Sequence, residues 1–134
     1  MEKKFKRDIN TLAEVFDFVE QYSTKHAIHG SLLFSIKFII EELFTNMVKY
    51  NISDTQSDIS IGLHRNDRQL TIQLIDYDVG AFDITNVKEV DTTQPLQERK
   101  IGGLGIHLVK KMVDAIDYEY SNRQSKITLT KNLE

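Results

Sequence analysis

The chain of 134 residues contains no cysteine, one proline and six glycines. The absence of cysteine excludes disulfide frameworks, thiolate metal sites and cysteine nucleophiles. No apolar run is long enough to span a membrane. The basic N-terminus MEKKFKRD also lacks the apolar segment of a secretory signal, so we expect a cytoplasmic protein. Because glycine is scarce, the positions of the few glycines are informative.

Net charge, composition and length further limit the kinds of protein that this chain can be. Seventeen Lys and Arg residues against twenty Asp and Glu give a net charge of −3, which argues against a general nucleic-acid binder. Hydrophobic residues make up 40% and charged residues 28% of the chain, as in folded rather than disordered proteins. Domains commonly have about 150 residues, and no repeat or Pro-rich linker divides this chain. We therefore expect a single domain over residues 1–134.

Hydrophobic periodicity predicts three helices and two strand pairs. Helical spacing of apolar residues runs over 12–25, 33–51 and 103–116, with Gly30 between the first two helices. Thr11 and Glu14 fit a capping box at the first helix. Alternation over 59–63, 70–74, 116–121 and 126–131 predicts strands, and residues 3–9 give a weaker strand signal. This order favours an α+β two-layer sandwich with helices on one face of a mixed, mostly antiparallel sheet.

A long polar stretch separates the second predicted hairpin strand from the third helix. It runs from residue 77 to about residue 100 and contains Pro95, the only proline. A loop of this length inside a compact domain usually has a function. We therefore predict a lid around residues 84–102.

Three polar residues share one stripe of the second predicted helix, in the segment FIIEELFTNMVKYN. Glu42 and Asn46 are four residues apart and Lys49 follows three residues later, so all three border the apolar face. A carboxylate can accept a proton, an amide oxygen can ligate Mg²⁺, and an ammonium group can bind phosphate. A solvent-exposed helix decorated with Glu and Lys would show the same residues, so the stripe alone leaves both interpretations open.

The second strand of the predicted hairpin ends in two aspartates. Strand parity places Asp76 and Asp78 on the same face as the apolar residues of 70–74, and Gly80 follows in a turn. Either carboxylate could accept a hydrogen bond from the exocyclic amine of a purine. A polar turn that merely ends a strand would also contain Asp and Gly.

Three glycines open the third predicted helix, in the segment IGGLGIHLVKKM. Gly102, Gly103 and Gly105 would let the backbone approach a ligand closely, and a helix N-terminus favours anions. The segment is neither a P-loop nor a Rossmann fingerprint, because it lacks the lysine of the first and the third glycine and βαβ context of the second. A flexible hinge before a helix is the alternative.

These three features follow the order of the ATP-binding motifs of the GHKL superfamily of ATPases, so the chain resembles that superfamily. An E-x-x-x-N helix, a strand that ends in Asp near Gly, and GGLG at a helix start follow one another along the chain. The similarity is closer still to the small anti-sigma factor serine kinases of bacteria, in EELFTN and in GGLGIHLVKKMVDAIDY. This resemblance covers nearly the whole chain and implies the ATP-binding sandwich of that superfamily.

The resemblance also implies roles for individual residues. Glu42 matches the general base that activates a serine hydroxyl or water, and Asn46 matches the Mg²⁺ ligand. The remaining positions match groups around the phosphates: the backbone of Gly103, Leu104 and Gly105, the side chain of Arg99, and, as in some relatives, a basic residue at Lys49. Gly102 is counted with this segment as an ATP-binding residue. One segment departs from the pattern Asp-x-Gly-x-x-Phe-Asp, because Asp78 stands where the family has glycine. We favour Asp76 as the partner of adenine and keep Asp78 beside it, with Gly80 in the same turn.

The function implied is an ATP- and Mg²⁺-dependent serine/threonine protein kinase. Its substrate would be a small anti-sigma factor antagonist, its regulatory target a sigma factor, and its expected state a homodimer that binds neither nucleic acid nor membrane. The alternative is a non-catalytic partner-switching regulator of the same fold that binds nucleotide weakly. A detached catalytic domain of a histidine kinase is a third interpretation.

Overall fold

The computed structural model describes residues 1–50, 56–80 and 103–133. Their elements follow the predicted order, with a short 3-10 turn, η1, before the first helix. They are β1 (Glu2–Phe5), η1 (Ile9–Thr11), α1 (Leu12–Lys25), α2 (Gly30–Tyr50), β2 (Ile59–Arg65), β3 (Gln69–Tyr77), α3 (Gly103–Met112), β4 (Ala115–Ser121) and β5 (Gln124–Asn132). The predicted lid lies outside the described residues.

The five described strands form one sheet in the order β1-β2-β3-β5-β4. Every described pairing is antiparallel, so the prediction of a mixed sheet is wrong in this respect. The reason lies in the connection through α3. Strand β4, which follows α3, runs in the same direction as β3, but β5 lies between β3 and β4 in the sheet. The two parallel strands are therefore never neighbours.

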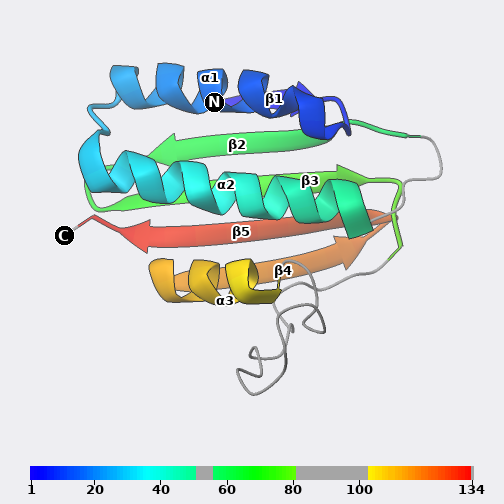
Figure 1. The fold of residues 1–134 in the computed structure, drawn as a ribbon. Helices are drawn as coiled ribbons and strands as arrows, with labels where there is room; N and C mark the ends of the chain where they lie inside the picture. Colours follow the sequence, from blue (N-terminus) through cyan, green and yellow to red (C-terminus); the bar gives the residue numbers. More distant parts are fainter. Residues whose placement is uncertain (51–55, 81–102, 134) are drawn as a thin grey trace.

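The three α-helices of the described residues cover the same face of the sheet (Figure 1). Alternate residues of β3, among them Leu70, Ile72 and Leu74, are fully buried beneath them. In α2 the buried side chains recur at helical spacing, as at Ile36, Ile40 and Leu43. The two periodicities meet in one apolar layer, which confirms the α+β two-layer sandwich. In the part of the chain that the structure describes, no helix is long and apolar enough to cross a membrane.

The start of α1 differs from the predicted capping box. Thr11 makes no side-chain capping bond. Instead the carboxylate of Asp8 accepts a hydrogen bond from the backbone N–H of Asn10 at 2.9 Å and opens η1. The chain therefore begins to turn immediately after β1, one turn earlier than expected. Gly30 has a positive φ of 63°, which confirms the predicted break between α1 and α2.

Candidate functional site

The stripe predicted on α2 forms a hydrogen-bonded pair. The Nδ2 of Asn46 donates to the Oε1 of Glu42 at 2.9 Å and to its backbone carbonyl at 2.6 Å. Asn46 is buried and Glu42 is half-buried, whereas Lys49, in the last turn, is exposed. Among the residues that the structure describes, none donates a hydrogen bond to the Oδ1 of Asn46. The pair therefore offers a carboxylate and an amide oxygen side by side at the edge of the core.

The first turn of α3 lies directly against this pair. A Cβ atom added to Gly105 would overlap the carboxyl group of Glu42, so only a glycine leaves room for that side chain. Unpaired N–H groups make the start of a helix favourable for negative charge, and the Glu42 carboxylate lies against Gly105 in the first turn of α3. Gly105 of the predicted glycine segment and Glu42 of the predicted stripe therefore lie against each other, although some sixty residues separate them in sequence.

This contact predicts a functional cost for a methyl group at Gly105. In a Gly105→Ala protein the Glu42 side chain must move, because it is the flexible partner of the overlap. Stability should change little, since alanine favours a helix by about 1 kcal/mol over glycine and a displaced hydrogen bond costs a similar amount. Any activity that depends on Glu42 should fall clearly, as measured by single-turnover kinetics.

A double mutant shows whether the loss of activity in Gly105→Ala depends on the Glu42 carboxylate. Gly105→Ala should cause no further loss of activity in a protein that already lacks the Glu42 carboxylate. Gly62→Ala is the matched control, because a methyl group there meets ordinary contacts at 3.8–4.0 Å. Equal losses from Gly105→Ala with and without the carboxylate would show that the contact has no functional role.

Asp76 lies on the inner face of the sheet, as its parity predicts, and is fully buried. Its carboxylate is already engaged by the guanidinium of Arg7, the second residue after β1. The Nη1 of Arg7 donates to Oδ2 at 3.3 Å, and its Nη2 contacts Oδ1. A buried carboxylate requires such a partner. The assignment of Asp76 as the adenine acceptor stays a prediction, now with an arginine beside it.

Asp78 does not follow the parity that the sequence predicts. β3 ends at Tyr77, and Asp78 adopts a positive φ of 55°, which turns the chain out of the strand. Its carboxylate accepts a hydrogen bond from the Nε of Arg123 at 3.0 Å, in the turn between β4 and β5. The N–H of Val79 donates to the carbonyl of Arg123 at 3.0 Å. Asp78 therefore fixes the turn that leads to the exposed Gly80.

The structure describes only some of the other residues that the sequence predicts near the phosphates. Gly103 and Leu104 begin α3, beside Gly105. Arg99 and Gly102 lie outside the described residues. The described members of the predicted site belong to the end of β3 and the turn after it, the second half of α2 and the first turn of α3, and β3 and α2 end on the same side of the molecule (Figure 1).

Sequence reasoning missed two residues at this end. Arg7 stood in a weak strand signal, and a single basic residue gives no sign of its partner. Ser125 is buried on the inner face of β5, in register with Asp76, and its Oγ lies 3.3 Å from the hydroxyl oxygen of Tyr118. A serine at an inward position of an alternating strand, two residues before Ile127, was a signal that could have found it.

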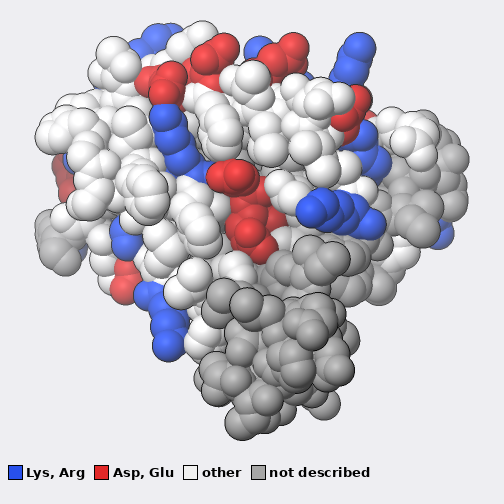
Figure 2. Space-filling view, viewed as in Figure 1, with Lys and Arg blue, Asp and Glu red and all other residues white. Residues whose placement is uncertain are grey.

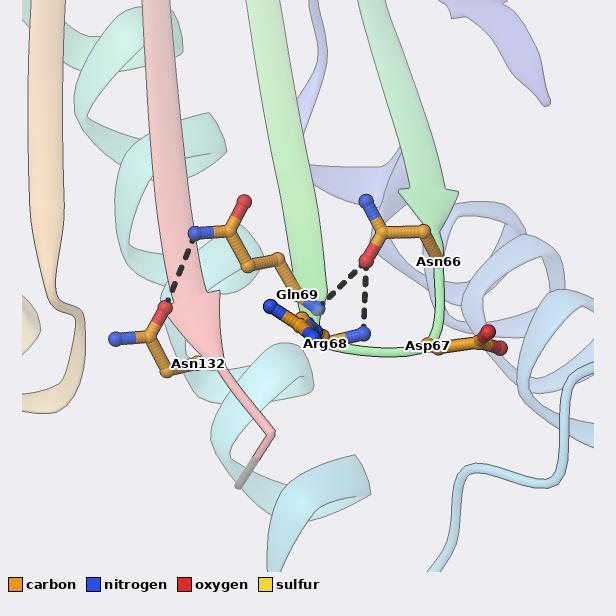
Figure 3. A pocket seen from close by; sticks show the side chains of 5 residues that line it. All are labelled: Asn66, Asp67, Arg68, Gln69 and Asn132. Atoms are coloured by element: carbon orange, nitrogen blue, oxygen red, sulfur yellow. Dashed lines mark hydrogen bonds between the residues drawn. The ribbon is translucent and has the colours of Figure 1, made fainter.

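The described surface has a hollow of about 640 Å³ at the opposite end of the sheet. Figure 3 shows its lining side chains on the turn between β2 and β3 and at the end of β5: Asn66, Asp67, Arg68, Gln69 and Asn132. The Oδ1 of Asn66 accepts hydrogen bonds from the backbone N–H groups of Arg68 and Gln69, both at 2.8 Å. These bonds order a hairpin turn, and the hollow is separate from the Glu42 site.

The charge on the helix-covered face matters for any anionic ligand. Figure 2 shows acidic side chains gathered near the middle of this face, with a basic side chain close by. Glu41 and Glu42 are consecutive residues of α2 on this side of the sheet. A polyphosphate that approaches Glu42 therefore needs a cation to offset the repulsion between the two negative groups.

Comparison with known families identifies the class to which this fold and site belong. The family model described as the histidine kinase-like ATPase domain matches residues 5–131. The chain therefore belongs to the histidine kinase-like ATPase family, within the GHKL superfamily that the sequence motifs indicated. A search of curated proteins finds no match to the chain. The family supports ATP binding as the activity of this fold.

The residues present fit Mg·ATP. Gly105 itself adds no side-chain atoms to the first turn of α3, as suits a backbone segment that lies over phosphates. The amide oxygen of Asn46 belongs to the hard oxygen ligands that Mg²⁺ prefers. When bound, Mg²⁺ would neutralise charge on the phosphates of ATP.

Proposed function

We propose that the protein is an ATP-dependent serine/threonine kinase of the anti-sigma factor type. It phosphorylates a small antagonist protein and so regulates a sigma factor by partner switching. The observation that carries this proposal is the position of Glu42, whose carboxylate is held by Asn46 and lies against the first turn of α3. A base at the phosphate-binding end of the site is the group that a protein kinase requires. We expect the active form to be a homodimer.

The chemistry assigned to the site is a transfer of the γ-phosphoryl group to a hydroxyl oxygen. Glu42 accepts the proton of the serine or threonine hydroxyl. At the same time the hydroxyl oxygen bonds to the γ-phosphorus, and the bond from that phosphorus to the β-phosphate oxygen breaks. The Nδ2 of Asn46 orients the Glu42 carboxylate. Arg99, by its resemblance to the family pattern, stabilises the charge on the transferring group.

A non-catalytic regulator of the same fold is the second candidate. It is favoured by the two aspartates at the end of β3, because Arg7 engages Asp76 and Arg123 engages Asp78. If neither carboxylate contacts a base, nucleotide binding is weak and the domain acts through its partners alone.

Phosphoryl transfer distinguishes the two functions. The protein is incubated with Mg²⁺, γ-labelled ATP and the small proteins encoded next to its gene. The kinase assignment predicts label on a serine or threonine of one of them, located by mass spectrometry. If ATP binds but no partner is labelled, the non-catalytic regulator is correct.

The role of Asn46 gives a further prediction. Asn46→Ala removes the amide oxygen, so the affinity for Mg·ATP should fall at least about tenfold, as for other metal-site substitutions. The affinity for ATP without Mg²⁺ should change much less. Asn66→Ala is the matched control, because Asn66 orders the hairpin at the far end of the sheet. Calorimetry with and without Mg²⁺ measures both affinities, and equal losses in the two conditions would remove the metal role.

A further inference from the structure

An arginine from the N-terminal segment is buried beside the carboxylate that we assign to adenine. The side chain of Arg7 is 5% exposed and that of Asp76 is 0% exposed. Both terminal nitrogens of the guanidinium reach the carboxylate, with Nη1 at 3.3 Å from Oδ2 and Nη2 against Oδ1. Two-point contact of this kind fixes the plane of a carboxylate as well as its charge.

Arg7 is itself anchored by the backbone of two other segments. Its Nε donates to the carbonyl oxygen of Ser57 at 3.2 Å, just before β2. Its Nη1 also donates to the carbonyl oxygen of Met47 at 3.3 Å, in the second half of α2. These two bonds do not involve Asp76, so they hold the guanidinium in place whatever the carboxylate contacts.

The consequence for base recognition follows from the chemistry of a carboxylate. Each carboxylate oxygen has two lone pairs, so a contact with arginine does not by itself prevent a carboxylate from accepting from another donor. An ionised carboxylate only accepts hydrogen bonds, so it pairs with an amino group and not with a keto oxygen. Arginine stays charged at any physiological pH, so a cation always faces the Asp76 carboxylate.

We infer that Arg7 is a positioning residue for nucleotide selection. It holds Asp76 as an oriented acceptor, and the site thereby prefers a purine with an amino group at C6 over one with a keto group. This inference rests on the proposed binding of ATP. The anchoring of Arg7 by two backbone carbonyls argues against the opposite role, in which Arg7 would be displaced from Asp76 by the base.

The test compares ATP with ITP, which carries a keto oxygen in place of the amino group. The folded wild-type protein should bind ATP about tenfold to a hundredfold more tightly than ITP, because the amino group donates to a charged acceptor. In Arg7→Met this ratio should approach one through weaker ATP binding, while the affinity for ITP stays unchanged. A purely structural role would weaken both nucleotides alike. Calorimetry gives both affinities, and thermal unfolding establishes the folded fraction.

Two further variants complete the design. Arg65→Met is the matched control, since Arg65 donates to the carbonyl of His26 at the opposite end of the sheet, and it should keep the wild-type ratio. Arg7→Lys keeps the charge without the two-point contact and should give an intermediate ratio. If Arg7→Met does not fold, Arg7→Lys decides: a clearly reduced ratio supports the inference and an unchanged ratio contradicts it.

The measured affinities distinguish a failure of the Arg7 inference from a failure of the proposed function. An unchanged ratio in folded Arg7→Met overturns the positioning role, and tighter ATP binding would identify Arg7 as a competitor of the base. A wild-type protein that binds ATP and ITP equally overturns this inference but leaves the proposed function intact. A wild-type protein that binds neither overturns both.

Discussion

Glu42→Gln should abolish phosphoryl transfer and leave the binding of Mg·ATP almost unchanged. Glutamine keeps the volume that lies against Gly105 and can still accept a hydrogen bond from Asn46, but it cannot accept the proton of the substrate hydroxyl. General bases contribute about a hundredfold to ten-thousandfold to rate constants. Single-turnover transfer should slow by that factor, whereas the dissociation constant measured by calorimetry should change less than about threefold.

The neighbouring glutamate provides the control. Glu41 is exposed on α2, so Glu41→Gln makes the same change in charge without touching the site. Its transfer rate should equal that of the wild type. Undiminished transfer in Glu42→Gln would remove Glu42 from the reaction, and equal losses in both variants would indicate a general effect of charge on this face.

Arg7→Met should lower the free energy of unfolding by about 3–5 kcal/mol, because it leaves the carboxylate of Asp76 buried without its ionic partner. The loss is large against a total stability of about 5–15 kcal/mol, yet it leaves room for a folded population at low temperature. Urea unfolding of the variant and the wild type, monitored by circular dichroism, measures the difference.

A double-mutant cycle shows whether the loss comes from the ion pair. Arg7→Met combined with Asp76→Leu removes both charges and replaces them with apolar groups, which is often nearly neutral for a buried pair. The double variant should therefore be more stable than the sum of the two single losses predicts. Simple additivity would mean that Arg7 stabilises the fold through its bonds to the carbonyls of Met47 and Ser57 instead.

The fold could be predicted from sequence because its elements carry strong local patterns. Alternation over 59–63 and 70–74 corresponds to β2 (Ile59–Arg65) and β3 (Gln69–Tyr77), with the ends shifted by a few residues. The helices of the sandwich show the 3.6-residue period of a one-sided apolar face. The purely antiparallel pairing was missed, because the position of β5 between β3 and β4 depends on contacts far apart in sequence.

The candidate site likewise contains some contacts that local sequence patterns predict and others that they do not. Glu42 and Asn46 were predicted to lie on one stripe because four residues on a helix bring side chains together, and the structure shows their hydrogen bond. The contact of Gly105 with Glu42 agrees with a role for the glycines. The ion pair of Arg7 with Asp76 joins residues 69 positions apart, and no local pattern announces it. The left-handed backbone of Asp78 likewise depends on the turn at Arg123.

The binding of Mg·ATP is the most direct test of the central claim, that the end of β3, the second half of α2 and the start of α3 form a nucleotide site. Calorimetric titration of the wild-type chain with ATP should give saturable binding that is stronger with Mg²⁺ than without it, together with a rise in melting temperature. Absence of heat and an unchanged melting temperature at millimolar Mg·ATP would contradict it.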